Sequence, residues 1–307
     1  MAAEPATRIV KKRRRIQQKR RSDAGSSRFK SRDADILRFG AEQTFTRFDT
    51  VGEYLAPGYT PASSKPPPSQ LTDTTAPVKR GWPADLRHRL MAVSRLMRKL
   101  AARGYVEIIQ PWSDQPAWFR VTAQGLRYLG LDWPEIPFPD TYEDLEARLR
   151  HDRYFKSHHH LINQTRVLLA RGGAGAPKHT WKGERAIEEA LPPREQGVRR
   201  QHKLDGAIRL EEDGSWEVRA KDGTVLDSVA MKAGQIIGIE VECSQKSTAR
   251  LAEILPDIIA HLDFVWYFCA SPTIKQAVAD ARKNALKTDD ERRRVRILLL
   301  EEYLPCL

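Results

Sequence analysis

The first half of the chain carries three helical patterns of unequal length. Apolar residues at roughly helical spacing predict short helices over residues 33–43 and 45–55, and a longer helix over residues 83–103. Within the long segment the apolar residues recur at steps of four and three, as Leu86, Leu90, Val93, Met97 and Leu100. They form one continuous stripe, so this helix is expected to pack through one face and to expose the other.

A β-hairpin and a short closing helix are predicted directly after the long helix. Residues 105–110 and 117–121 have strand-like patterns separated by a turn that contains proline and aspartate. Thr122 is a suitable N-cap for the helix that follows. This order of elements is typical of a winged helix-turn-helix domain, here over residues 31–135. Residues 57–80, rich in Pro, Ser and Thr, are expected to form a flexible loop within it.

The second half alternates between apolar strand-like runs and amphipathic helices. The predicted strands are residues 204–210, 216–219, 236–243, 264–269 and 295–300, and the predicted helices are residues 184–191, 251–262 and 273–286. We expect strand 216–219 to pair with strand 204–210, and Pro256 to kink or divide its helix. The prediction for residues 136–307 is an α/β domain with a mixed sheet, which makes the fold class of the whole chain α+β.

The positive charge of the chain is concentrated at its amino terminus. The 307 residues carry a net charge of +12, and the first 30 hold eleven Lys and Arg against two acidic residues. The run Lys11, Lys12, Arg13, Arg14 and Arg15 cannot form a core, so residues 1–30 are expected to be a disordered basic tail. Such a tail binds nucleic acid by releasing counterions from the backbone. A solvating tail, or a tail that contacts an acidic protein, is the alternative.

A second basic surface is expected on the long helix, opposite its apolar stripe. Projection at 100° per residue places five cationic side chains there: Arg87, Arg95, Arg98, Lys99 and Arg103. Since the predicted hairpin follows directly, this face is interpreted as the one that meets double-stranded DNA. A solvated helix surface is the alternative.

Composition excludes several classes of protein. No run approaches the about 18 consecutive apolar residues that a membrane-spanning helix needs, and the start of the chain lacks the apolar segment of a signal peptide. A cytoplasmic location without a membrane partner is expected. The three cysteines, Cys243, Cys269 and Cys306, lie far apart without a CxxC pair, so neither a disulfide framework nor a zinc site is predicted.

Acidic residues stand at the ends of two predicted strands. Because successive strand residues point to opposite faces, Glu240 and Glu242 are expected to share one face while Ile239, Val241 and Cys243 pack on the other. Asp205 stands at the start of strand 204–210. Buried carboxylates require a cation, a basic partner or water, so these acids suggest a metal-assisted site that acts on a polyanion. The alternative is that they lie on a solvated face or in ion pairs.

Histidines cluster at residues 158–160, with His151 seven residues earlier. Adjacent residues of a helix cannot share one face, so a three-histidine metal site is not expected there. Ordinary polar or capping roles are predicted for these side chains.

A set of motifs in fixed order resembles the replication-relaxation family of bacterial plasmids and mobile elements. The motifs are His160-Leu161, Asn163-Gln164, Trp181 with Glu184, Leu204-Asp205-Gly206, and the run from Glu240 through Lys246 followed by Arg250-Leu251. The segment Val121 to Leu126 resembles the end of that family's first, winged-helix domain. The similarity covers roughly residues 31–300 and leaves out the basic tail.

The second half of that family resembles the PD-(D/E)XK nuclease core. The resemblance implies that Asp205 and Glu240 hold Mg²⁺, or Mn²⁺ in its place, with Glu184 as the helical acid before them. Leu204 stands where the motif has proline, and Glu242 stands where it has lysine. Lys246, four residues later, is the candidate that replaces this missing lysine.

Three functions follow as hypotheses. In the first, the protein is a DNA-binding, Mg²⁺-dependent endonuclease or nickase that acts in replication or conjugative transfer. In the second, it is a non-catalytic DNA-binding accessory or transcriptional regulator whose nuclease-like domain binds DNA or a protein partner without cutting. A structural adaptor is the third. The sequence leaves open whether the protein cleaves DNA, which replication or transfer proteins it contacts, and its oligomeric state.

Overall fold

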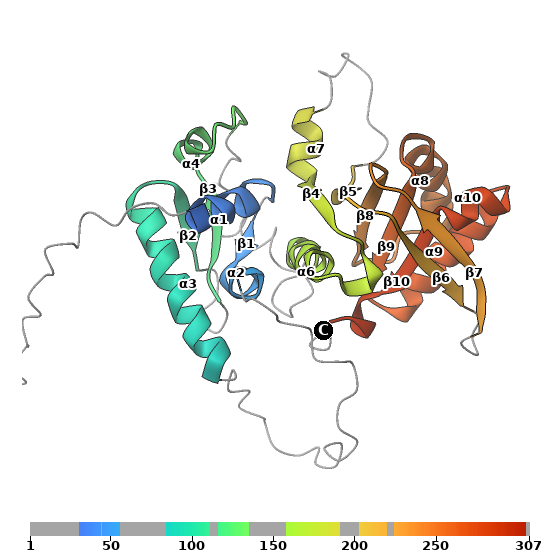
Figure 1. Cartoon of the computed structure of the whole chain (residues 1–307), viewed down its shortest axis with the longest axis horizontal. Helices are drawn as coiled ribbons and strands as arrows, with labels where there is room; N and C mark the ends of the chain where they lie inside the picture. The colour runs from blue at the N-terminus through green and yellow to red at the C-terminus, as the bar shows by residue number, and fades with distance from the viewer. Residues whose placement is uncertain are drawn as a thin grey trace, which may run out of the picture.

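The computed structural model describes residues 31–43, 45–55, 84–110, 116–134, 158–190, 203–219 and 224–304. Side chains are described for all of these except residues 84–89, 188–190, 218–219 and 226. The predictions for the basic tail, for residues 57–80 and for the side chain of Arg87 lie outside them. The described part is a mixed α+β structure, in which one group of elements precedes residue 135 and a second group follows residue 157 (Figure 1).

The first group, here called the N-terminal unit, combines four helices with a small antiparallel sheet. Its elements are α1 (Ser31–Ala41), β1 (Thr46–Arg47), α2 (Phe48–Tyr54), α3 (Ala84–Ala102), β2 (Val106–Ile109), β3 (Trp118–Val121) and α4 (Ala123–Tyr128). The strand order is β1-β3-β2. The predicted helix over residues 45–55 is wrong at its start, because Thr46 and Arg47 pair with Phe119 and Trp118. Pairing with a strand distant in sequence leaves no periodic signal in so short a segment.

The helix α3 packs as its apolar stripe predicts. Val93, Met97 and Leu100 are buried among residues of α1, α2 and the small sheet. The start of α4 is also as expected, since Thr122 Oγ1 accepts a hydrogen bond from Gly125 N at 3.2 Å. This cap satisfies one of the free amides of the first helical turn.

The second group, here called the C-terminal unit, is built on a five-stranded mixed sheet. Its helices are α6 (His158–Ala170), α7 (Glu184–Ala190), α8 (Thr248–His261), α9 (Pro272–Ala285) and α10 (Asp289–Arg293). Its strands are β4 (His179–Gly183), β5 (Gly206–Leu210), β6 (Gly214–Arg219), β7 (Val225–Met231), β8 (Ile236–Glu242), β9 (Phe264–Cys269) and β10 (Val295–Leu299). The order in the sheet is β10-β9-β8-β5-β4, where β8, β9 and β10 run parallel and β5 runs antiparallel to both its neighbours.

The two faces of this sheet are covered by different helices (Figure 1). Leu161 and Leu168 of α6 pack with Trp216 of the β6–β7 hairpin on one face. Helices α8 and α9 cover the other face, where Leu255 and Val278 are buried against β9. Each face therefore has its own core, and the sheet separates the two.

Two details of this unit differ from the sequence predictions. Strand β6 pairs with β7 and not with β5, whose partners are β4 and β8. Helix α8 is not divided at Pro256, which was one of the two outcomes expected for it, and Leu255, Ile258 and Ile259 on either side of the proline are buried. Burial of this apolar face against the sheet stabilises the helix where the proline ring weakens its hydrogen bonding.

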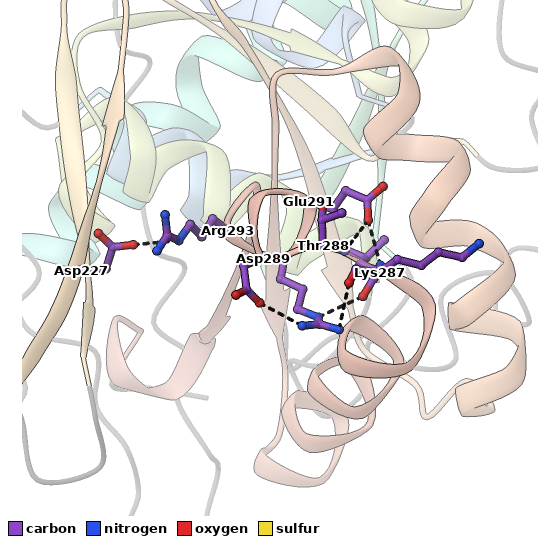
Figure 2. A network of polar contacts seen from close by, with 8 residues as sticks. Asp227, Lys287, Thr288, Asp289, Glu291 and Arg293 are labelled. Atoms are coloured by element: carbon purple, nitrogen blue, oxygen red, sulfur yellow. Dashed lines mark hydrogen bonds and ion pairs between the residues drawn. The ribbon is translucent and has the colours of Figure 1, made fainter.

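The β6–β7 hairpin is tied to the short helix α10. Figure 2 shows Arg293 reaching toward Asp227 of β7, and the two side chains form an ion pair with an N–O distance of 2.9 Å. In the same network Thr288 and Glu291 form a capping box at the start of α10. The box fixes the first turn of this helix, so the cation on its last turn is held in place for the hairpin.

The N-terminal unit packs against α6 and β4. Asn163 Nδ2 donates a hydrogen bond to the carbonyl of Phe45 at 3.0 Å, and Gln164 Nε2 donates one to Thr50 Oγ1 at 3.3 Å. A Cβ placed on Gly183 would lie 2.2 Å from the carbonyl oxygen of Glu42, so the two main chains meet closely there. In the described part of the chain, no helix is both long enough and apolar enough to cross a membrane.

Candidate functional site

Asp205 is held at the end of β8 by a main-chain contact. Its Oδ2 atom accepts a hydrogen bond from Val241 N at 2.7 Å. The register of the two strands, in which Gly206 lies opposite Ile239, brings the carboxylate to this position. Glycine follows the aspartate because the ring of Trp181 lies where a Cβ would stand, 2.3 Å from the nearest ring atom.

Glu240 and Glu242 lie on the same face of β8, as alternation predicts. Ile239 and Val241 belong to the core on the opposite face. Glu240 and Glu242 are only 3% and 4% exposed, and Asp205 is 6% exposed. These three residues, here called the acidic cluster, are therefore buried, and the alternative of a solvated face is wrong.

Lys246 is the basic partner of Glu242. Its ammonium forms a short ion pair with Glu242 Oε2, and Ser244 Oγ lies 3.4 Å from Glu242 Oε1. Lys246 stands in the loop between β8 and α8, directly before the N-cap residue Ser247. The side chain of Lys246 thus turns back toward the end of β8.

His158 joins the acidic cluster, although sequence reasoning assigned it no part in the site. Its Nε2 atom lies 3.1 Å from Asp205 Oδ2. Burial by itself lowers the pKa of His158, but the hydrogen bond to Asp205 and the charges of Asp205 and Glu240 outweigh burial and raise the pKa to about 9. The only signal in the sequence was the histidine run at the start of a helix, and its contact lies 47 residues away.

Glu240 is the carboxylate most affected by its surroundings. Burial and then the nearby charge of Asp205 raise its pKa, while the charges of Lys246 and His158 act in the opposite direction. Asp205, Lys246 and His158 therefore all lie close enough to Glu240 to act on its charge.

Tyr267 forms the inner wall of the site. It lies beside Glu240 in the parallel register of β8 and β9, and it is 1% exposed. Burial, followed by the charges of Glu240 and Glu242, raises the pKa of its hydroxyl. Among the described residues this hydroxyl has no hydrogen-bond partner.

Glu184 reaches the acidic cluster through its main chain. Its backbone N–H donates to the carbonyl of Asp205 at 3.2 Å. Its carboxylate lies 3.9 Å from Nζ of Lys203. The predicted helical acid is thus adjacent to Asp205, with a lysine near its side chain.

The acidic cluster offers the type of ligand atom that Mg²⁺ prefers, but its side chains are not arranged around a common metal position. Carboxylate oxygens are the ligands that this ion prefers. Within the described ranges, however, no group of three or more His, Cys, Asp or Glu side chains is arranged to hold a metal ion. Asp205 already accepts from Val241 and faces His158, and Glu242 already pairs with Lys246.

The predicted DNA-binding residues of α3, together with Arg103 directly after it, divide into exposed and packed side chains. Arg95 and Arg98 are exposed, and Arg103 is half-buried. Lys99 lies against α1, where its Nζ is 3.4 Å from Oδ2 of the buried Asp33. The predicted contacts of Arg87 and of the tail residues Lys11, Lys12, Arg13, Arg14 and Arg15 lie outside the described side chains.

Comparisons of the chain with protein families, with curated proteins and with solved structures found no match. The resemblance to replication-relaxation proteins stays a prediction from sequence motifs.

Proposed function

We propose that the protein binds double-stranded DNA through the N-terminal unit, as a winged helix-turn-helix protein. The element order supports this assignment, since α1, α2 and α3 are followed by the β2–β3 hairpin and α4. Strand β1 completes the small sheet by pairing with β3. In winged-helix proteins the third helix enters the major groove, and the hairpin touches the backbone beside it.

The observation that carries this proposal is the division of α3 into two faces. Val93, Met97 and Leu100 anchor the helix in the core, while Arg95 and Arg98 stay exposed on the other side. An exposed arginine pair on a rigid helix provides contacts to phosphate and to guanine edges. The high positive charge of the first 30 residues adds sequence-independent affinity.

The C-terminal unit is proposed to be nuclease-like. Asp205 directly precedes β5, and Glu240 lies near the end of the adjacent strand β8, so both stand at the same end of this pair of interior strands. The ammonium of Lys246 approaches the same end of β8 and can take the place of the motif lysine. In this first candidate function, Asp205 and Glu240 would hold Mg²⁺ or Mn²⁺, and the ion would supply Lewis-acid activation for phosphodiester hydrolysis in plasmid or mobile-element replication or transfer.

A second candidate is a DNA-binding accessory or regulatory protein that does not cut. Two contacts favour this second candidate: His158 with Asp205, and Lys246 with Glu242. In both, a basic side chain of the protein compensates the charge of the carboxylate, so no metal ion is needed for that purpose. A metal ion would have to displace His158 from Asp205 Oδ2 before it could bind there.

Incubation of the full chain with supercoiled plasmid and Mg²⁺ or Mn²⁺ distinguishes the two candidates. Under the first, nicked product forms, and the double variant Asp205→Ala/Glu240→Ala forms none while its DNA affinity is retained. Under the second, neither protein cuts and both bind. Loss of DNA binding by the unmodified chain at low salt would contradict both.

A further inference from the structure

The solvent side of the acidic cluster is basic. The side chains of His158 and Lys246 are 48% and 35% exposed, whereas those of Asp205 and Glu242 are 9% and 5% exposed. The carboxylates of Asp205 and Glu242 thus lie deeper in the protein than the side chains of His158 and Lys246 with which they pair. A ligand that approaches from solvent meets the ammonium of Lys246 and the ring edge of His158 first.

The buried acids also fix these two side chains in position. Lys246 is held by Glu242, and His158 is held by Asp205, whose second contact is the main chain of Val241. Both basic groups act on the charge of Glu240, so both lie near this carboxylate. A lysine held in this way loses less conformational freedom on binding an anion than a freely rotating one does.

The hydroxyl of Tyr267 is an independent sign of a polar ligand at this position. It is buried beside Glu240 and Glu242, and in the described part of the chain it makes no hydrogen bond. Buried hydroxyls are normally satisfied by protein or water. Unused hydrogen-bonding capacity on the inner wall fits a site that is completed by a hydrated polar group.

We propose that Lys246 and His158 form a site of the C-terminal unit that contacts the phosphates of the DNA backbone without a divalent metal. This inference rests on the proposed DNA binding by α3 and assigns a second point of contact on the same chain. The ammonium of Lys246 supplies the charge for a nonbridging phosphate oxygen, and His158 forms the polar edge beside it. Because Lys246 and His158 already compensate part of the acidic charge, this contact requires no metal ion.

The test is DNA affinity of the full chain as a function of salt, measured by fluorescence anisotropy of a labelled duplex in EDTA. Lys246→Gln is expected to weaken binding about three- to tenfold and to reduce the slope of log K against log salt by about 1. Lys232→Gln is the matched control, because Lys232 is also paired with a carboxylate, Asp213 at 3.2 Å, and precedes β8 at its other end. The control is expected to bind like the unmodified protein.

A second variant separates a contact from a folding effect. Glu242→Gln keeps the ammonium of Lys246 and leaves an amide oxygen that can still accept its hydrogen bond, while it removes one negative charge. It is therefore expected to bind DNA as tightly as the unmodified chain or more tightly. Equal slopes for Lys246→Gln and Lys232→Gln, or weaker binding by Glu242→Gln, would overturn the proposal. So would tighter binding on addition of Mg²⁺ at constant ionic strength, since that result indicates a metal bridge.

Failure of this inference and failure of the proposed function give different results. If Arg95→Ala and Arg98→Ala weaken binding while Lys246→Gln does not, only the second contact is wrong. If the two arginine variants bind like the unmodified chain, the assignment of α3 is wrong as well.

Discussion

Arg166 of α6 forms an ion pair with Glu42, directly after α1, and thereby joins the two units inside the protein. The N–O distance is 2.8 Å, and the side chains are 10% and 12% exposed. The guanidinium also donates to the carbonyl of Phe39 at 3.1 Å and lies 4.2 Å from the centre of the Phe39 ring. Burial raises the pKa of Glu42, and the charge of Arg166 opposes that effect.

Replacement of Arg166 by alanine is expected to destabilise the protein by about 3 kcal/mol, because it leaves Glu42 buried without its cation. The measurement is urea denaturation near pH 7. Arg250→Ala is the control, since Arg250 forms an exposed pair with Glu253 at 2.8 Å and such pairs contribute less than about 1 kcal/mol. Equal losses in the two variants would contradict a structural role for the Arg166–Glu42 pair.

Gly183→Ala tests the close approach of the units at β4. The new Cβ would meet the Glu42 carbonyl at 2.2 Å, and a main-chain atom cannot move aside alone. A loss of about 1–3 kcal/mol is expected by thermal or urea unfolding. Gly52→Ala in α2 is the matched control, because its Cβ would lie 3.8 Å from Val93 Cγ2 and alanine favours a helix. If Gly52→Ala lost as much stability as Gly183→Ala, the steric explanation for Gly183 would be contradicted.

The contact between His158 and Asp205 predicts a dependence of stability on pH. Since the pKa of His158 is raised from 6.5 to about 9 in the folded protein, its stabilisation is complete below pH 6.5 and is lost as the pH rises through 9. The melting temperature of the unmodified chain should therefore fall more between pH 6.5 and 9.5 than that of His158→Gln. Parallel curves for the two proteins would show that this histidine does not gain a proton on folding.

Arg95→Ala and Arg98→Ala are each expected to weaken DNA binding and to lower the salt slope by about 1 if the side chain meets a phosphate. An arginine that meets a base edge should instead change sequence preference. Titrations of several duplexes at two or more salt concentrations separate these cases. Lys283→Ala on the exposed side of α9 is the control and should leave both quantities unchanged.

Periodic elements were the most predictable part of the fold. The apolar stripe of α3, with Val93, Met97 and Leu100, and the alternation around Glu240 in β8 each follow from the geometry of one element. The cap at Thr122 was also readable, because capping depends on a hydrogen bond within one turn.

Elements without local periodicity were not predictable. Strand β4, with the sequence His-Thr-Trp-Lys-Gly, was missed because it lacks an apolar run and gains its strand conformation by pairing with β5. The pairing of β6 with β7 was also missed, since local patterns do not say which strand another one meets.

The sequence by itself determined which face of each regular element is apolar and where the acidic and basic residues stand along the chain, because both depend on near neighbours. Only the tertiary structure decided that His158 meets Asp205, 47 residues away, and that the acids lie buried. Contacts between distant segments depend on how whole elements pack, and no local pattern encodes them. The fold therefore determines that the basic side chains of His158 and Lys246, and not the acids, face solvent at this site.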